Sequence, residues 1–197
     1  MTLAAVARLL LYVGSLIVVG EMVLAWQLAR VGRARERVEV ESDGQLRDGR
    51  ARALVMSAWL LAIVALAAML LRQALDMELA RTVADATMLL TQTSWGRGWS
   101  ILAATVLCGA MATALRAPRV VTGAFVLGVA IAMSGLGHSA ADDTYPLLSR
   151  AADSVHVLSV GAWIGGLLLL AATRPASADD AGWQAFSSVA TVAAPLT

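Results

Sequence analysis

The chain contains two histidines, His138 and His156, and each stands at the edge of an apolar run. His138 ends one run in AMSGLGHSAADD, and His156 lies a little over one helical turn into the next, ADSVHVLSVGAWIGG. Consecutive membrane spans joined by a short connection pack antiparallel, so their adjoining ends lie at one membrane boundary. We therefore expect the two imidazoles to be neighbours that share one ligand, and such nitrogens suit copper, zinc or haem iron.

A carboxylate and a thioether accompany these histidines. Asp153 precedes His156 by three residues, the spacing that places both on one helix face. Its carboxylate can then accept the second imidazole hydrogen or join the ligand set. Met133 lies five residues before His138, and thioethers favour Cu(I), so the mixture favours copper over zinc.

A structural interpretation competes with the metal site. A boundary histidine can be a satisfied interfacial residue, and a methionine such as Met133 taken alone is more often core filler. The pair of histidines favours function, because ionisable groups in membranes are costly and are normally kept for a purpose. The sequence therefore predicts a metal site that comprises His138, His156, Asp153 and Met133.

Glu21 is the acidic residue that lies well inside a predicted span. An unpaired charge there costs on the order of 3 kcal/mol or more, so we expect Glu21 to be protonated, water-exposed or paired. It is a candidate relay for an ion or a proton. The alternative is that its side chain reaches toward the nearby membrane boundary.

The composition is that of an integral membrane protein, with 59% hydrophobic and 15% charged residues and a mean hydropathy of +0.73. Apolar runs of roughly 20 residues predict membrane-spanning helices. We expect an all-α, polytopic transmembrane helical bundle that forms a single domain over residues 1–197, with five spans and a partial sixth. The predicted spans are 3–29, 52–71, 99–115, 119–137 and 152–173, followed by the partial span 183–197.

The placement of arginine predicts the orientation of these spans. Ten of the fifteen arginines fall in the loop 30–52, in the turn 116–119 and at Arg174, which predicts that these segments are cytoplasmic and that the N-terminus is outside. The loop 30–52 mixes charges without an apolar period, so we expect a solvated linker. Residues 75–90 carry Leu75, Leu79, Val83 and Ala86 at helical spacing, which predicts a helix along the outer membrane surface.

Small residues follow His156 in the fifth predicted span. Gly161 and Gly165 form a GxxxG pair, which lets another helix backbone approach closely. Trp163 lies about two turns beyond His156, so we expect it on the same face, as the floor of a metal pocket or as a packing residue.

Several classes of function are disfavoured by the sequence. The net charge is +1 and no basic face stands out, which argues against a nucleic-acid partner. The single Cys108 can form neither an internal disulfide nor a paired-cysteine metal motif. No nucleophile and base stand at a plausible spacing, so we do not expect an enzyme.

Three motifs together resemble the CopD family of bacterial copper resistance and copper uptake proteins. They are TSWGRGW at 93–99, SGLGHSA at 134–140 and DSVHVLSVGAWIGGL at 153–167, and the resemblance runs over residues 70–190. It implies an inner-membrane, multi-pass helical protein that moves copper from the periplasm toward the cytoplasm, with a periplasmic partner of the CopC type. Members of the family commonly have about eight spans, more than this chain shows.

By position, His138, Asp153 and His156 match the motif residues of that family, which implies two histidine ligands and an orienting carboxylate. The leading hypothesis is a copper-handling membrane protein. The alternatives are a membrane cytochrome that uses His138 and His156 as axial ligands of haem, and a structural subunit without a site.

Overall fold

The computed structural model describes residues 3–34, 41–77, 82–136, 144–172 and 180–196, and these residues form helices and turns without a strand. The eight α-helices are α1 (Leu3–Ala34), α2 (Glu41–Asp76), α3 (Val83–Gln92), α4 (Ser94–Ala114), α5 (Arg119–Ser134), α6 (Pro146–Val160), α7 (Gly166–Ala172) and α8 (Asp180–Ala193). A π-helical segment, η2 (Gly161–Gly165), joins α6 to α7, and a short 3-10 turn, η3 (Ala194–Leu196), follows α8. The all-α prediction is confirmed.

Three of the helical stretches that the structure describes are long and apolar enough to cross a membrane. They cover Ala5–Gln27, Gly49–Asp76 and Pro146–Ala172. The helix Arg119–Ser134 is apolar but shorter, and α4 opens with polar and charged residues around Arg97. The count of five spans and the outward N-terminus therefore stay predictions.

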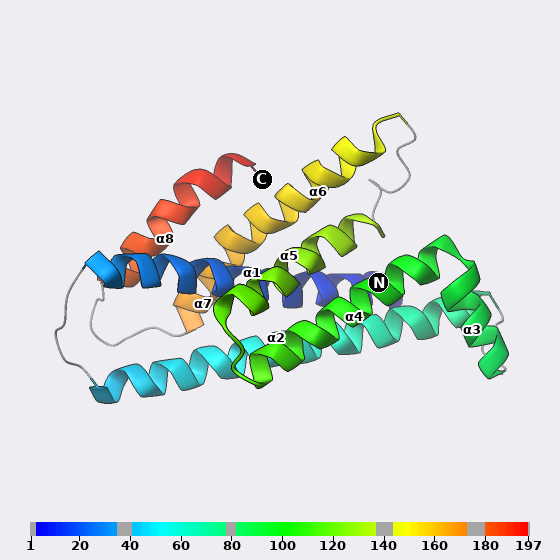
Figure 1. Cartoon of the computed structure of the whole chain (residues 1–197), viewed down its shortest axis with the longest axis horizontal. Helices are drawn as coiled ribbons and strands as arrows, with labels where there is room; N and C mark the ends of the chain where they lie inside the picture. The colour runs from blue at the N-terminus through cyan, green and yellow to red at the C-terminus, as the bar shows by residue number, and fades with distance from the viewer. Residues whose placement is uncertain (1–2, 35–40, 78–81, 137–143, 173–179, 197) are drawn as a thin grey trace.

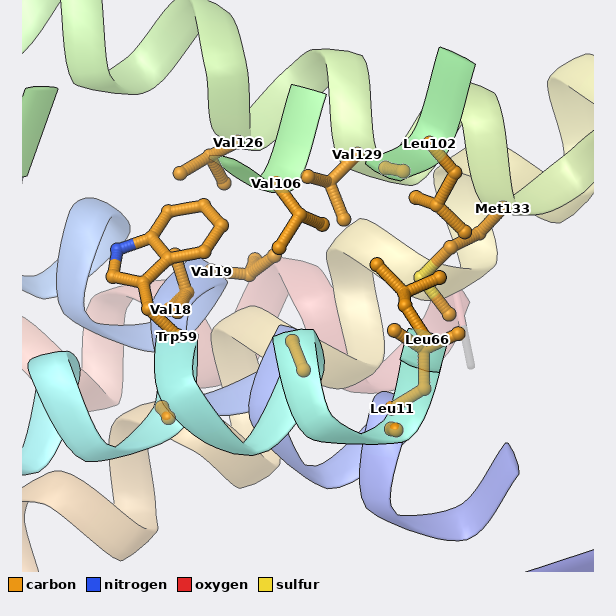
Figure 2. Packing of buried hydrophobic residues seen from close by; sticks show 14 of the residues in the cluster. Leu11, Val18, Val19, Trp59, Leu66, Leu102, Val106, Val126, Val129 and Met133 are labelled. Carbon is orange, nitrogen blue, oxygen red and sulfur yellow. The ribbon is translucent and has the colours of Figure 1, made fainter. Parts of the chain in front are cut away.

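Helix α1 is the centre of the bundle. It contacts α2, α5, α6, η2, α7 and α8, while α4 packs between α2 and α5. Figure 1 shows these helices lying roughly along one axis, with successive long helices running in opposite directions. The start of α1, helix α3, the end of α5 and the start of α6 lie at one end of the bundle. The core that holds them together is mainly apolar, and includes Val19, Trp59, Leu102 and Val106 (Figure 2). Burial of such side chains is what fixes the helices against one another.

The structure differs from the surface helix predicted over residues 75–90. Helix α2 continues through Leu75 to Asp76, and a new helix begins at Val83, where Thr82 and Asp85 form a capping box. Residues 75–90 are therefore not one helix, and their apolar positions do not form one stripe: Val83 is 85% exposed. Leu89 is the buried side chain of α3, because α3 turns directly into α4 at Thr93. Leu79 lies outside the described residues.

The predicted linker 30–52 is also corrected. Helix α1 reaches Ala34 and α2 begins at Glu41, so most of this stretch is helical. Residues with high helix propensity, such as Leu46, Arg47 and Arg50, outweigh the local cost of Gly44 and Gly49. Residues 35–40 lie outside the described part of the chain.

Candidate functional site

Helix α6 carries the best-placed of the predicted metal ligands. The helix begins with Pro146 in its first turn, a position where the missing N–H of proline costs no hydrogen bond. Ser154 and Val157 face the bundle and are buried, whereas His156 is exposed and Asp153 is half-buried. The i,i+3 spacing leaves Asp153 beside the imidazole on the helix surface. The structure thus places His156 on the outer surface of the bundle, about three turns beyond Pro146 and within a helical stretch that is long and apolar enough to cross a membrane. The prediction that His156 lies a little over one turn into its span is wrong, because α6 begins earlier than expected.

Met133 occupies a different environment. It lies in the last turn of α5, is 5% exposed, and belongs to the same apolar core as Leu66 and Leu102 (Figure 2). Helices α5 and α6 pack against each other, but Met133 is turned into the bundle and His156 out of it. The structure does not bring the thioether and this imidazole together at one buried position.

His138 lies in residues 137–143, outside the described residues. The end of α5 at Ser134 and the start of α6 at Pro146 lie at the same end of the bundle (Figure 1). Within the described ranges there is no group of three or more His, Cys, Asp or Glu side chains that could hold a metal. The predicted pairing of His138 with His156 therefore stays a prediction.

The glycines that follow His156 form the closest helix contact in the bundle. A Cβ built on Gly161 would lie 2.6 Å from the Cβ of Val19, and one built on Gly165 would overlap the carbonyl of Leu16. Gly20 faces back onto Gly165 and Gly166 in the same way. The GxxxG prediction is confirmed, because backbone meets backbone where α1 crosses η2.

The same contact coincides with the π-helical segment, which sequence reasoning missed. A π-helical turn inserts an extra residue into a helix, and such turns are frequent at functional sites. Trp163 stands in this wider turn and is partly exposed, so it lies outside the contact with α1. Its predicted place beneath His156 assumed an unbroken α-helix between the two residues.

Glu21 is half-buried on α1, and Arg119 at the start of α5 interacts with it electrostatically. The neighbouring Met22 packs against Gly123 on α5. Among the described residues no salt bridge joins Glu21 to Arg119, so the state of this carboxyl group, protonated, water-exposed or paired, stays a prediction. The contact of Met22 with Gly123 joins α1 to α5 beside Glu21.

A buried hydroxyl in the core was also missed by sequence reasoning. Ser15 on α1 is 3% exposed, and its Oγ has no hydrogen-bond partner. It lines a cavity of about 10 Å³ between α1, α2 and α5, together with Gly14, Val18, Val19, Trp59, Ala62, Val126 and Val129. The signal in the sequence is a serine at the centre of an apolar run, beside a glycine.

Comparison with known proteins identifies the family. The family profile described as copper resistance protein D-like, N-terminal domain, matches residues 1–148, which is most of the chain. The match ends in the first turn of α6, so Asp153, His156 and η2 lie beyond it. No curated protein and no solved structure matches the chain. On the strength of the profile match and its apolar helices, this membrane protein belongs to the copper resistance protein D-like family.

Proposed function

We propose that this protein moves copper across the bacterial inner membrane, from the periplasm toward the cytoplasm. Membership of a copper resistance family supports copper as the cargo. The observation that carries the mechanism is the exposed imidazole of His156, one turn beyond Asp153 on α6, the helix that packs against α5. An imidazole in this place is accessible to an ion that reaches the outer surface of the bundle.

In this mechanism the two histidines receive the ion. His156 and His138 supply nitrogen ligands, and Asp153 fixes the tautomer and orientation of the His156 ring by accepting its second N–H. Because imidazole binds copper in either common oxidation state, the docking step needs no thioether at the surface.

Met133 acts later, after the ion has entered between the helices. Its sulfur lies in the apolar core of α5, where only an ion that has left water can reach it. A thioether in such surroundings favours Cu(I). Glu21, about five turns beyond Leu3 on α1, is the proposed acceptor of the ion on its way to the exit, and Arg119 at the start of α5 interacts with its carboxyl group electrostatically.

A periplasmic copper-binding protein of the CopC type is the proposed donor. The exposed face of α6 around His156 is the surface that such a donor contacts, because the transferred ion must bridge ligands of both proteins. The haem alternative has no support from the described residues or from the family match.

The test is metal analysis of the purified chain in detergent after exposure to Cu(I) and to Cu(II). We expect the wild type to retain copper, and the double variant His138→Ala, His156→Ala to lose most of it. Asp153→Asn keeps the shape of the side chain and is expected to weaken copper binding by about tenfold to a hundredfold, because it removes the charged partner of the imidazole.

A neighbouring exposed residue on α6 provides the matched control. Val155→Ala changes the same helix surface without removing a ligand, so its copper content should equal that of the wild type. Equal copper in the wild type and in the double histidine variant disproves the proposed site. A visible haem absorption band in the wild type, lost in the double variant, establishes the cytochrome instead.

A further inference from the structure

We propose that the end of the bundle formed by the turn between α4 and α5 and the neighbouring part of α2 binds the headgroup of an anionic phospholipid. Four arginines lie at the end of the bundle where α2 passes the turn between α4 and α5, and we call them the arginine patch: Arg50, Arg52, Arg116 and Arg119. This proposal is independent of the copper mechanism, because it uses other residues in another part of the molecule.

One hydrogen bond brings the parts of the patch together. Arg52 on α2 donates from Nη2 to the carbonyl oxygen of Ala114, at 2.9 Å, in the last turn of α4. Arg116 follows two residues later in the tight turn between α4 and α5, and Arg119 is the first residue of α5. The guanidinium groups of α2 and of the turn therefore lie at one level of the bundle.

The backbone at Arg116 shows that this turn is not built for an arginine. Its φ is +55°, in the left-handed region, and the N–H of Ala117 bonds the carbonyl of Ala112 while the N–H of Arg116 bonds that of Thr113. This is the arrangement in which glycine is usually found after a helix. Arg116 therefore places an exposed cationic side chain at a position whose backbone conformation favours glycine.

Among the residues whose side chains the structure describes, few acids balance the charge of the patch. There is no acidic residue in residues 49–75 of α2, in α4 or in α5. Glu21 on α1 is the acid that the structure places near the patch, and it interacts with Arg119. Within the described residues, Arg50 and Arg116 have no ion-pair partner. Guanidinium groups bind phosphate oxygens in a bidentate manner, so a phosphate group complements this surface.

Exposed apolar side chains identify the phosphate as that of a lipid. Leu115 is 73% exposed and Val120 is 82% exposed, and they flank Arg116 and Arg119 along the chain. Met111, one turn earlier on α4, is also exposed. Cations beside apolar residues match the headgroup and acyl chains of a phospholipid, whereas a free phosphate ion makes no use of the apolar part.

The test is lipid binding to the full chain, measured by native mass spectrometry from detergent titrated with phosphatidylglycerol or phosphatidylcholine. We expect retention of phosphatidylglycerol and little of phosphatidylcholine. The variant Arg50→Gln, Arg116→Gln, Arg119→Gln should bind phosphatidylglycerol at least about tenfold more weakly, because each arginine near a membrane surface strengthens binding to anionic lipid. Arg52 is left in place because it holds α2 against α4.

The matched control removes three exposed arginines from the other end of the bundle, as Arg8→Gln, Arg97→Gln, Arg150→Gln. It should bind phosphatidylglycerol as the wild type does. An equal loss of lipid in both triple variants, or no loss in the patch variant, overturns the proposal. Displacement of the lipid by millimolar inorganic phosphate also overturns it, because the site is then an anion site.

A single substitution separates lipid binding from folding. Arg116→Gly removes the side chain but favours the left-handed backbone, so the melting temperature should rise while the affinity for phosphatidylglycerol falls several-fold. Unchanged lipid affinity in this well-folded variant contradicts the proposed role of Arg116.

Discussion

The two sides of α1 differ in whether the packing leaves free volume. Toward η2, Gly20 and Gly165 allow the two backbones to touch, and no side chain separates them. Toward α2, Gly14 also lets α1 approach the backbone closely, but a small cavity remains between α1, α2 and α5 beside Ser15 and Trp59. One side is therefore a fixed junction, while the other keeps free volume and an unpartnered polar group in the middle of the bundle.

This difference bears on how an ion could pass between the helices. Backbone contacts do not open without displacing whole helices, because packed interfaces move as units and do not deform continuously. Side chains around a cavity can change rotamers without moving the backbone. For the proposed copper movement, the junction of α1 with α2 and α5 is the interface that can rearrange, and the junction with η2 is the pivot.

The largest effect is expected from Gly165→Ala. The new Cβ would overlap the backbone of Leu16, so α1 and η2 must separate, at a cost of about 3 kcal/mol or more in the free energy of unfolding. The measurement is thermal denaturation of the purified chain in detergent. We expect a lowered melting temperature and, because the pivot is displaced, reduced copper accumulation in cells.

Gly49→Ala is the control for this substitution. A Cβ on Gly49 meets nothing within 4 Å, and the residue is helical, so alanine should be neutral or stabilising by up to about 1 kcal/mol. Equal melting temperatures for the two variants would show that the contact between α1 and η2 is not the tight junction inferred here.

A smaller loss is expected at Trp59, on the loosely packed side. Its indole Nε1 donates to Thr113 Oγ1 at 3.0 Å, and its ring fills the space against Gly109. Trp59→Phe removes the donor and part of the ring, and should lower the free energy of unfolding by about 2 kcal/mol.

Thr113→Val removes the acceptor of the hydrogen bond from Trp59 and serves as the control for Trp59→Phe. The double variant Trp59→Phe, Thr113→Val should lose less than the sum of the single losses, because one bond is removed in both. Strict additivity in chemical or thermal denaturation would mean that this bond does not hold α2 to α4.

The sequence predicted the parts of this architecture that depend on local pattern. Long apolar runs predicted the helices, and the GxxxG pair at Gly161 and Gly165 predicted the close helix contact. Both patterns can be recognised from residues that lie near one another in the sequence. The start of α2 at Glu41 was missed because charged residues of high helix propensity look like a solvated linker when no apolar period is present.

The candidate site was harder to predict because it depends on which way each side chain faces. The spacing of Asp153 and His156 fixed their common helix face, and the structure agrees. Whether Met133 points toward the histidines or into the core depends on the packing of α5 against α1 and α4, which no spacing in α5 alone reveals. The π-helical segment and the cavity beside Ser15 likewise arise from contacts with α1, far away in the sequence.

The smallest effect on the free energy of unfolding is expected from two serine variants. They compare a buried hydroxyl that has no hydrogen-bond partner with a buried hydroxyl that has one. Ser15 Oγ is buried without a partner, whereas Ser134 Oγ, equally buried, donates to the carbonyl of Ile131 at 2.7 Å.

Ser15→Ala should raise the free energy of unfolding by about 1 kcal/mol, because it removes an unsatisfied hydroxyl, and Ser134→Ala should lower it by about 0.5–1.5 kcal/mol. Both variants gain the same helix propensity of alanine, so the difference between their melting temperatures isolates the hydrogen bond. If both shift stability in the same direction by the same amount, Ser15 is satisfied in the folded protein, and the contrast between the two sides of α1 rests on free volume alone.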